Sequence, residues 1–182
     1  MKCALQKEEI ISLVAQYDSE NDDTEAFKAG RRIRDGAYTL GNLITIAEWK
    51  LERAPGNYYP CMARIRKSDP VQVAKALRFS TSTSNRRLAI EILDEIDGIA
   101  VRVASAIMTT IHPDRFTIID VHALRELGEE KQASRPDTTV DFYLKYLDFC
   151  LATAAKLGVS LRDLDKALWQ KDVNRANRSP CK

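Results

Sequence analysis

The stretch from Ile96 to Leu124 constrains the fold of this chain more than any other part of the sequence. Before it, apolar residues at intervals of four predict a helix with the stripe Leu88, Ile92 and Ile96, with Leu93 beside them. Asp97-Gly98 should end that helix, because glycine accepts backbone angles that other residues resist. A second helix is predicted from near Ala100 until Pro113 stops it. The pattern therefore predicts two helices joined by a hairpin.

The second helix carries features suited to close packing and to an anion. Its buried side is predicted to consist of Val103, Ala104, Ile107 and Ile111, and the small residues at 104–106 allow a neighbour to approach closely. Its N-terminal amides, at about Gly98 to Arg102, favour a phosphate because they are unpaired and lie at the positive end of the helix dipole. Arg102 adds a cation in the first turn.

An aspartate follows this helix in a well-defined setting. Phe116 to Ile119 is an apolar segment, expected to be extended and buried. Asp120 comes next and precedes a helical run from Val121 to Leu127, so it is predicted to be an N-cap. The cap hydrogen bond and the helix dipole stabilise an ionised carboxylate, which can point into a cleft.

These features resemble the helix-hairpin-helix, glycine/proline-aspartate superfamily of DNA glycosylases. Gly98 matches the first hairpin glycine, Ala104 the small residue of the second helix, and Asp120 the catalytic aspartate. The interval of 18 residues from Arg102, at the family's lysine position, to Asp120 suits the family. The triplet Asp-Val-His at 120–122 is similar to that of the branch that removes oxidised guanine.

The resemblance implies an all-α fold of two helical lobes with a cleft between them. The central lobe would span about residues 30–126 with the hairpin at 96–102, and the second lobe about residues 1–29 plus 127–182. The strong likeness covers only about Arg86 to Gly128, and elsewhere it depends on the number of helices.

The expected chemistry is cleavage of an N-glycosidic bond in duplex DNA that contains a damaged or modified base. Asp120 would stabilise the sugar cation and orient or deprotonate a water, after the base has been extruded from the stack. By resemblance, the DNA contacts would be Gly98, Ala100, Arg102, Val103 and His122. The backbone carbonyls that would hold a Na⁺ or K⁺ ion beside a phosphate are those of Asp94, Ile96 and Ile99.

Two departures from the family pattern affect this prediction. Ala100 replaces the second hairpin glycine, so the hairpin geometry could differ. Arg102 replaces the lysine nucleophile of bifunctional members, and a guanidinium stays protonated and cannot form a Schiff base. A monofunctional enzyme is expected, or one with its lysine elsewhere. Lys50 is the best substitute amine, although a surface role is more common for a lysine.

The base pocket is predicted from aromatic residues upstream. Trp49, or Tyr58 and Tyr59 in an expected aromatic loop at 57–60, could stack on an extruded base. The alternative for Trp49 is a place in the core. Other predicted helices cover residues 8–17, 24–35, 39–53, 71–79, 139–158 and from 160, with a polar loop at 80–85 and a loose tail from Asn174.

Composition limits the cofactors and the location. The net charge is only +2, so a nucleic-acid surface must arise from local clustering. The scattered cysteines at 3, 61, 150 and 181 support neither zinc nor an iron–sulfur cluster. With no signal peptide, a cytoplasmic protein is expected, associated with the nucleoid in a bacterium. With no long apolar run, no membrane span is expected. A monomer is expected.

Three alternatives stay open at this point. Helix-hairpin-helix units also grip DNA without chemistry, so a non-catalytic binding module is the first. The second is a bifunctional glycosylase and lyase with a lysine outside the hairpin. The third is a helical interaction domain without salt-dependent DNA affinity. The identity of the base is also open: it could be oxidised, alkylated, deaminated or otherwise modified. The triplet Asp-Val-His slightly favours oxidised guanine.

Overall fold

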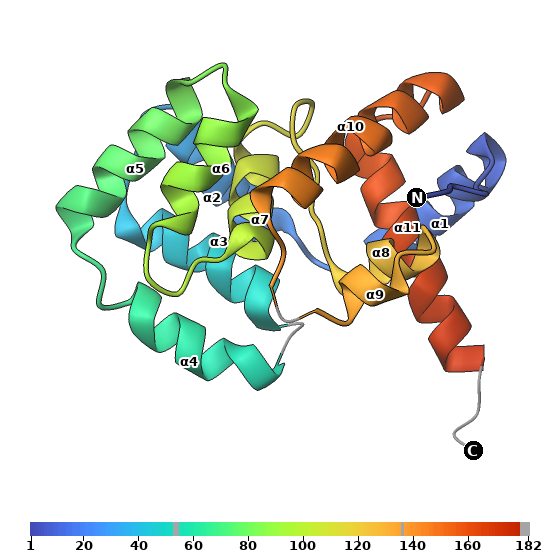
Figure 1. The fold of residues 1–182 in the computed structure, drawn as a ribbon, viewed down its shortest axis with the longest axis horizontal. Helices are drawn as coiled ribbons and strands as arrows, with labels where there is room; N and C mark the ends of the chain where they lie inside the picture. The colour runs from blue at the N-terminus through green and yellow to red at the C-terminus, as the bar shows by residue number, and fades with distance from the viewer. Residues whose placement is uncertain (53–54, 136, 179–182) are drawn as a thin grey trace.

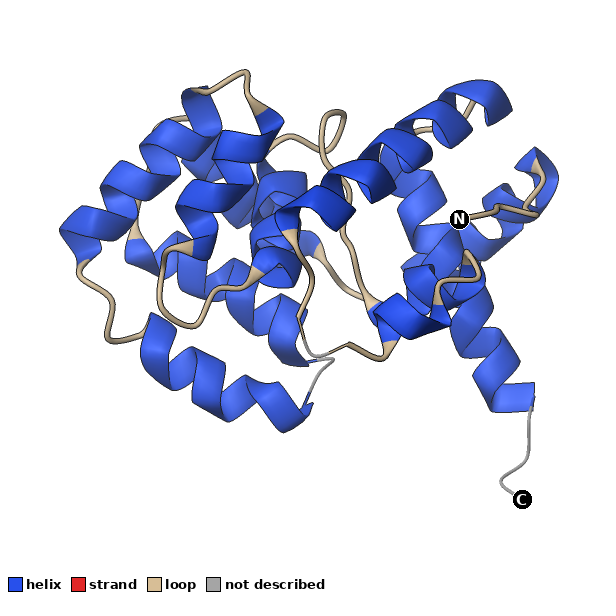
Figure 2. Cartoon of the chain, in the orientation of Figure 1, coloured by secondary structure: helices blue, strands red, loops and turns tan. Residues whose placement is uncertain are grey.

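The structure is a computed structural model that describes residues 1–52, 55–135 and 137–178. Every regular element in these ranges is a helix, so the predicted all-α class is confirmed (Figure 2). The helices are α1 (Lys7–Glu20), α2 (Thr24–Arg34), α3 (Leu40–Glu52), α4 (Pro55–Ile65), α5 (Pro70–Ser82), α6 (Arg86–Asp94), α7 (Val101–Ile111), α8 (Val121–Glu126), α9 (Glu130–Ala133), α10 (Val140–Leu157) and α11 (Leu161–Arg178). None of these helices is long and apolar enough to cross a bilayer.

The helices gather in two places (Figure 1). Helices α2 to α7 lie together on one side, where α7 packs against α2, α3 and α6. On the other side, α11 packs against α1 and α8. Helix α10 contacts both α6 and α11, and α8 continues the chain that leaves α7. The segment between α7 and α8 therefore runs from one group of helices to the other.

The predicted hairpin lies between α6 and α7. Gly98 has φ +89°, a left-handed angle that strains other residues. A Cβ at this position would also lie 2.6 Å from the carbonyl oxygen of Cys61 in α4. Glycine is thus required both by the bend and by the closeness of α4.

The face that α6 buries agrees with the predicted one only at Leu93. Leu88 is 43% exposed, and Ile92 and Ile96 are only half-buried. The buried residues are Ala89, Ile90 and Leu93. Apolar residues occur on two faces of this nine-residue helix, and contact with α5 and α7 selects the second face.

Every residue of helix α7 (Val101–Ile111) except Arg102 is buried. Gly30 of α2 explains how a neighbour comes so close, because a Cβ there would lie 2.3 Å from the carbonyl oxygen of Thr110. On another side, Oγ of Ser105 accepts the amide of Ile119 at 3.2 Å. Small residues on α7 and on its neighbour together allow this packing.

Three local predictions were wrong. The expected aromatic loop at 57–60 is part of α4, although Pro60 lies inside the helix and removes one backbone donor. The buried residues Met62 and Ile65 anchor the helix in the core. The expected loop at 80–85 is shorter, because α5 continues to Ser82. The tail from Asn174 is helical to 178, and hydrogen bonds between the side chains of Asn174 and Gln16 tie α11 to α1.

Candidate functional site

The segment from Phe116 to Ile119 lies outside the helices and is buried, as predicted. Side chains satisfy its backbone, since the hydroxyl groups of Tyr143 and Tyr146 donate to two of its carbonyls at 3.1 and 2.9 Å. Its last amide donates to Oγ of Ser105. Because an unpaired backbone group in the core is costly, these bonds fix the segment and the residue that follows it, Asp120.

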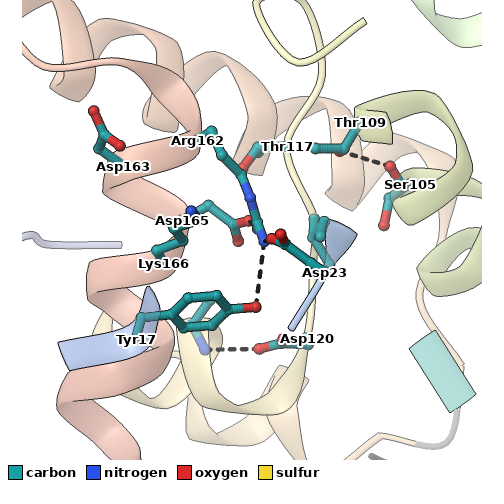
Figure 3. Close-up of polar contacts among 12 residues, drawn as sticks. Tyr17, Asp23, Ser105, Thr109, Thr117, Asp120, Arg162, Asp163, Asp165 and Lys166 are labelled. Atoms are coloured by element: carbon teal, nitrogen blue, oxygen red, sulfur yellow. Dashed lines mark hydrogen bonds and ion pairs between the residues drawn. The ribbon is translucent and has the colours of Figure 1, made fainter. Parts of the chain in front are cut away.

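Asp120 begins α8 as its N-cap, as predicted. Its Oδ1 accepts the amide of Ala123 at 3.0 Å, and its Oδ2 lies 3.4 Å from Nζ of Lys50 (dashed line to Asp120 in Figure 3). The side chains of Lys50 and Asp120 are 14% and 17% exposed. Burial alone would raise the pKa of Asp120, but the Lys50 ammonium and the Ala123 amide outweigh burial and hold that pKa below its usual value.

A cavity of about 270 Å³ opens beside this ion pair. Its lining combines the hairpin, the start of α8, the end of α3 and one face of α11, which are far apart in the sequence. The lining residues are Lys50, Leu51, Cys61, Gly98, Ala100, Arg102, Val103, Asp120, Val121, His122, Asp137, Thr138 and Trp169. The residues predicted as the catalytic carboxylate and the DNA contacts thus share one cavity with Lys50.

The other residues predicted for a base pocket lie elsewhere. Trp49 borders a much smaller space next to Asp120, and its ring packs edge-on to Phe27 at 6.2 Å. Tyr58 and Tyr59 form an edge-to-face pair on α4, where Tyr59 is 79% exposed. Neither tyrosine is among the described residues that line the cavity. A contact of either with an extruded base stays a prediction.

Arg102 lies at the wall of the cavity and is engaged by the chain between α9 and α10. Its Nε donates to Oγ1 of Thr138 at 2.9 Å, and its Nη2 donates to the carbonyl oxygens of Gln132 and Arg135 at 3.1 Å each. Burial lowers the pKa of Arg102, against the opposing effect of nearby carboxylates. In this arrangement the guanidinium holds a loop against the hairpin.

His122 is oriented by a residue that the sequence reasoning missed. Its Nδ1 lies 2.9 Å from Oδ2 of Asp172 on α11, and its ring lies 5.3 Å from that of Trp169. Trp169 and Asp172 are three residues apart and so share a face of α11. An aromatic residue and an acid at helical spacing were the available signal, although the sequence alone does not place this face at the cavity.

A buried ionic cluster lies next to Asp120, and sequence reasoning missed this as well (Figure 3). Arg162 is paired with Asp165 and donates to Oδ2 of Asp23 at 2.6 Å and to the hydroxyl of Tyr17 at 3.3 Å. Burial raises the pKa of Asp165 to about 6, because the effect of Arg162 is too small to offset burial and the negative charge of Asp120 adds to it. A second acid thus lies within electrostatic reach of Asp120.

The predicted cation site at the hairpin carbonyls stays a prediction. The carbonyl oxygen of Ile96 accepts the amide of Ile99 at 2.9 Å, and a second lone pair is left for a cation. Among the described side chains, no cluster of three or more His, Cys, Asp or Glu could hold a metal ion.

No family model matches this chain, and comparison with curated proteins and with solved structures gave no match either.

Proposed function

We propose that this protein is a DNA glycosylase that extrudes a damaged or modified base from a duplex and cleaves its N-glycosidic bond. One observation carries the proposal: Asp120, fixed at the start of α8, lines the same cavity as the hairpin glycine Gly98. This juxtaposition combines a charged group for the chemistry with a backbone bend for the DNA strand.

The carboxylate suits the chemistry of the glycosidic bond. Departure of the base leaves positive charge on the deoxyribose, which a preorganised anion stabilises without having to reorganise. The lowered pKa of Asp120 keeps it ionised at neutral pH, and its cap hydrogen bond fixes its direction. The same group can orient a water or accept its proton.

The hairpin suits a backbone grip. Ala100 is exposed at the turn into α7, an eleven-residue helix whose N-terminus is the positive end of its dipole and so favours a phosphate, although the amide of Val103 already donates to the carbonyl oxygen of Ala100 at 2.8 Å. Such contacts position the strand without reading its sequence. Trp169 also lines the cavity and offers an aromatic side chain on which an extruded base could stack. The fold would then be the two-lobed helix-hairpin-helix type, with the cavity between the lobes.

The test is base release from a panel of duplex oligonucleotides that carry oxidised, alkylated, deaminated or modified bases. Hot alkali after the reaction converts each abasic site to a strand break. The Asp120→Asn variant keeps an N-cap, because asparagine also caps helices, and it should lose base release by about 100-fold or more. Asp69→Asn is the matched control, since Asp69 also caps a helix, accepting the amide of Val71 at 2.9 Å, and lies outside the cavity.

Three results would contradict the proposal. One is a wild-type protein that binds duplex DNA with strong salt dependence but releases no base from any member of the panel, which identifies a binding module. The second is an Asp120→Asn variant as active as Asp69→Asn. The third is a wild type without salt-dependent DNA affinity, which indicates an interaction domain instead.

A further inference from the structure

Lys50 occupies an unusual place for a lysine. It lies in the last turn of α3, yet its side chain is only 14% exposed and lines the cavity beside Asp120. Its Nζ is 3.4 Å from the carboxylate that the proposed reaction uses. Among the described lining residues, it is the one that carries an amine.

Arg102 is a poor competitor for a nucleophilic role. A guanidinium remains protonated, and here three hydrogen bonds hold it to Thr138, Gln132 and Arg135. The expectation of a monofunctional enzyme came from this arginine alone. The position of Lys50 in the cavity is a reason to replace that expectation.

We propose that Nζ of Lys50 is the nucleophile that attacks C1′ of the extruded nucleotide, which makes the protein a glycosylase with strand-cleaving lyase activity. This inference rests on the proposed function and adds the attacking group. Lysine amines form imines with carbonyl carbons, and the C1′ of an opened deoxyribose is an aldehyde carbon.

The steps balance without an external oxidant or reductant. Lys50 first gives its ammonium proton to water, and the neutral amine then forms a bond to C1′. The base leaves with the electron pair of the C1′–N bond and takes up a proton from water. The attached nitrogen passes a proton to Asp120, which lies within reach of Nζ. The C1′–O4′ bond then breaks to give the imine, and O4′ gains a proton.

The imine makes the strand labile. It acidifies C2′, so loss of a C2′ proton expels the 3′ phosphate with the electron pair of the C3′–O3′ bond. Water finally hydrolyses the imine and returns the free amine of Lys50. The competing structural role is that Lys50 only neutralises Asp120, as a partner of a part-buried carboxylate.

The experiment uses duplex DNA with one preformed abasic site, treated with the full-length protein and borohydride. Borohydride reduces the imine to a stable covalent complex, and peptide mapping of the wild-type complex identifies the attached residue. The variants are Lys50→Gln and Lys50→Arg, of which the second keeps a positive charge beside Asp120 but cannot form an imine. Lys75→Gln is the matched control, because Lys75 is exposed on α5 and lies outside the cavity.

We expect a trapped complex and strand cleavage for the wild type and Lys75→Gln, with the adduct on Lys50. Trapping should fall by about 100-fold or more in both Lys50 variants. The proposal is overturned by a wild type that traps no DNA, by an adduct mapped to another residue, or by a Lys50→Arg variant that traps as well as Lys75→Gln. Peptide mapping uses the wild-type complex, so the assignment of the attached residue does not depend on whether Lys50→Gln folds.

This outcome is separable from that of the proposed function. Abasic DNA has no base at the reacting position, so trapping does not depend on base release. Base release that depends on Asp120 but occurs without trapping supports the glycosylase function and rejects Lys50 as the nucleophile. Trapping at Lys50 without release of any base rejects the glycosylase and leaves a lyase.

Discussion

Nδ1 of His122 lies 2.9 Å from Oδ2 of Asp172, a carboxylate whose side chain is only 5% exposed. The imidazole lines the cavity and the acid lies behind it on α11. The hydrogen bond commits Nδ1, so Nε2 is the nitrogen left to meet DNA. In the proposed glycosylase, Asp172 would thus be a positioning residue for His122.

The two residues should therefore act as one unit in a double-mutant cycle. We expect His122→Gln and Asp172→Asn each to weaken duplex binding about 5- to 10-fold, and the double variant to be little worse than either single one. That corresponds to a coupling of about 1 kcal/mol, within the range of residues in contact. Fluorescence anisotropy with labelled duplex measures the cycle. Arg125→Gln is the control, since Arg125 is 3.7 Å from Asp172 without being part of the imidazole contact. Losses that simply multiply in the double variant would show that the residues act independently.

The parts of the site that local signals determine could be predicted from the sequence. Gly98 marks the bend because its φ of +89° suits glycine, and Asp120 marks a helix start because its carboxylate caps α8. The buried face of α6 could not be predicted, since Leu88 and Leu93 look alike in the pattern and only packing decides between them.

Groups brought in from distant elements were beyond local reasoning. Lys50 was singled out for its amine, but its contact with Asp120 depends on how α3 packs near α8. Trp169 and Asp172 both lie on the last helix. The packing of α11 against α8 brings Trp169 to the cavity and Asp172 to His122. The pairing of Arg162 with Asp165 in the core likewise needs the tertiary fold to place it.

Gly30 should be indispensable for stability. In Gly30→Ala the new Cβ would meet the backbone of Thr110, which cannot rotate away, so α2 and α7 must separate. We expect a loss of roughly 3 kcal/mol, the upper range for overpacking, and a thermal midpoint lower by about 6–12 °C. Gly41→Ala is the matched control, also within a helix but with only Oγ1 of Thr39 near, at 3.9 Å. It should gain about 0.5–1 kcal/mol from reduced chain entropy. Equal midpoints for the two variants, measured by circular dichroism, would contradict the packing of α2 on α7.

Asp165 should make the protein less stable as pH rises. Its pKa of about 6 in the folded state is above the ordinary value of 3.8, so the folded protein holds this proton more tightly than the unfolded chain. The contribution of this proton to the free energy of unfolding is fully present below about pH 4 and is lost as the pH rises through about 6. Because the carboxylates with lowered pKa, such as Asp120, act in the opposite direction, the informative quantity is the difference between wild type and Asp165→Asn.

We expect the thermal midpoint of Asp165→Asn to improve relative to the wild type by roughly 4–8 °C between pH 4 and pH 7. This assumes that the Asp165 proton contributes about 2 kcal/mol to the free energy of unfolding. It also assumes that each kcal/mol shifts the midpoint by about 2–4 °C in a domain of this size. Arg162 keeps Asp23 as a partner in the variant, so it is not left as an unpaired buried cation. Parallel midpoints across this pH range would mean that Asp165 titrates normally.

The hairpin itself can be tested by separating backbone strain from steric clash. Gly98→Ala suffers both, since its φ is +89° and its Cβ would lie 2.6 Å from the carbonyl oxygen of Cys61. Gly128→Ala has φ +74° but nothing within 4 Å, so it carries the strain alone, roughly 1–2 kcal/mol. We expect Gly98→Ala to weaken binding to duplexes of any sequence about 10-fold and to flatten its salt dependence, because the displaced bend loses phosphate contacts. Gly128→Ala, outside the cavity, should lose stability while keeping wild-type affinity and salt dependence. If Gly98→Ala binds DNA as Gly128→Ala does, the bend between α6 and α7 is not the element that grips the strand.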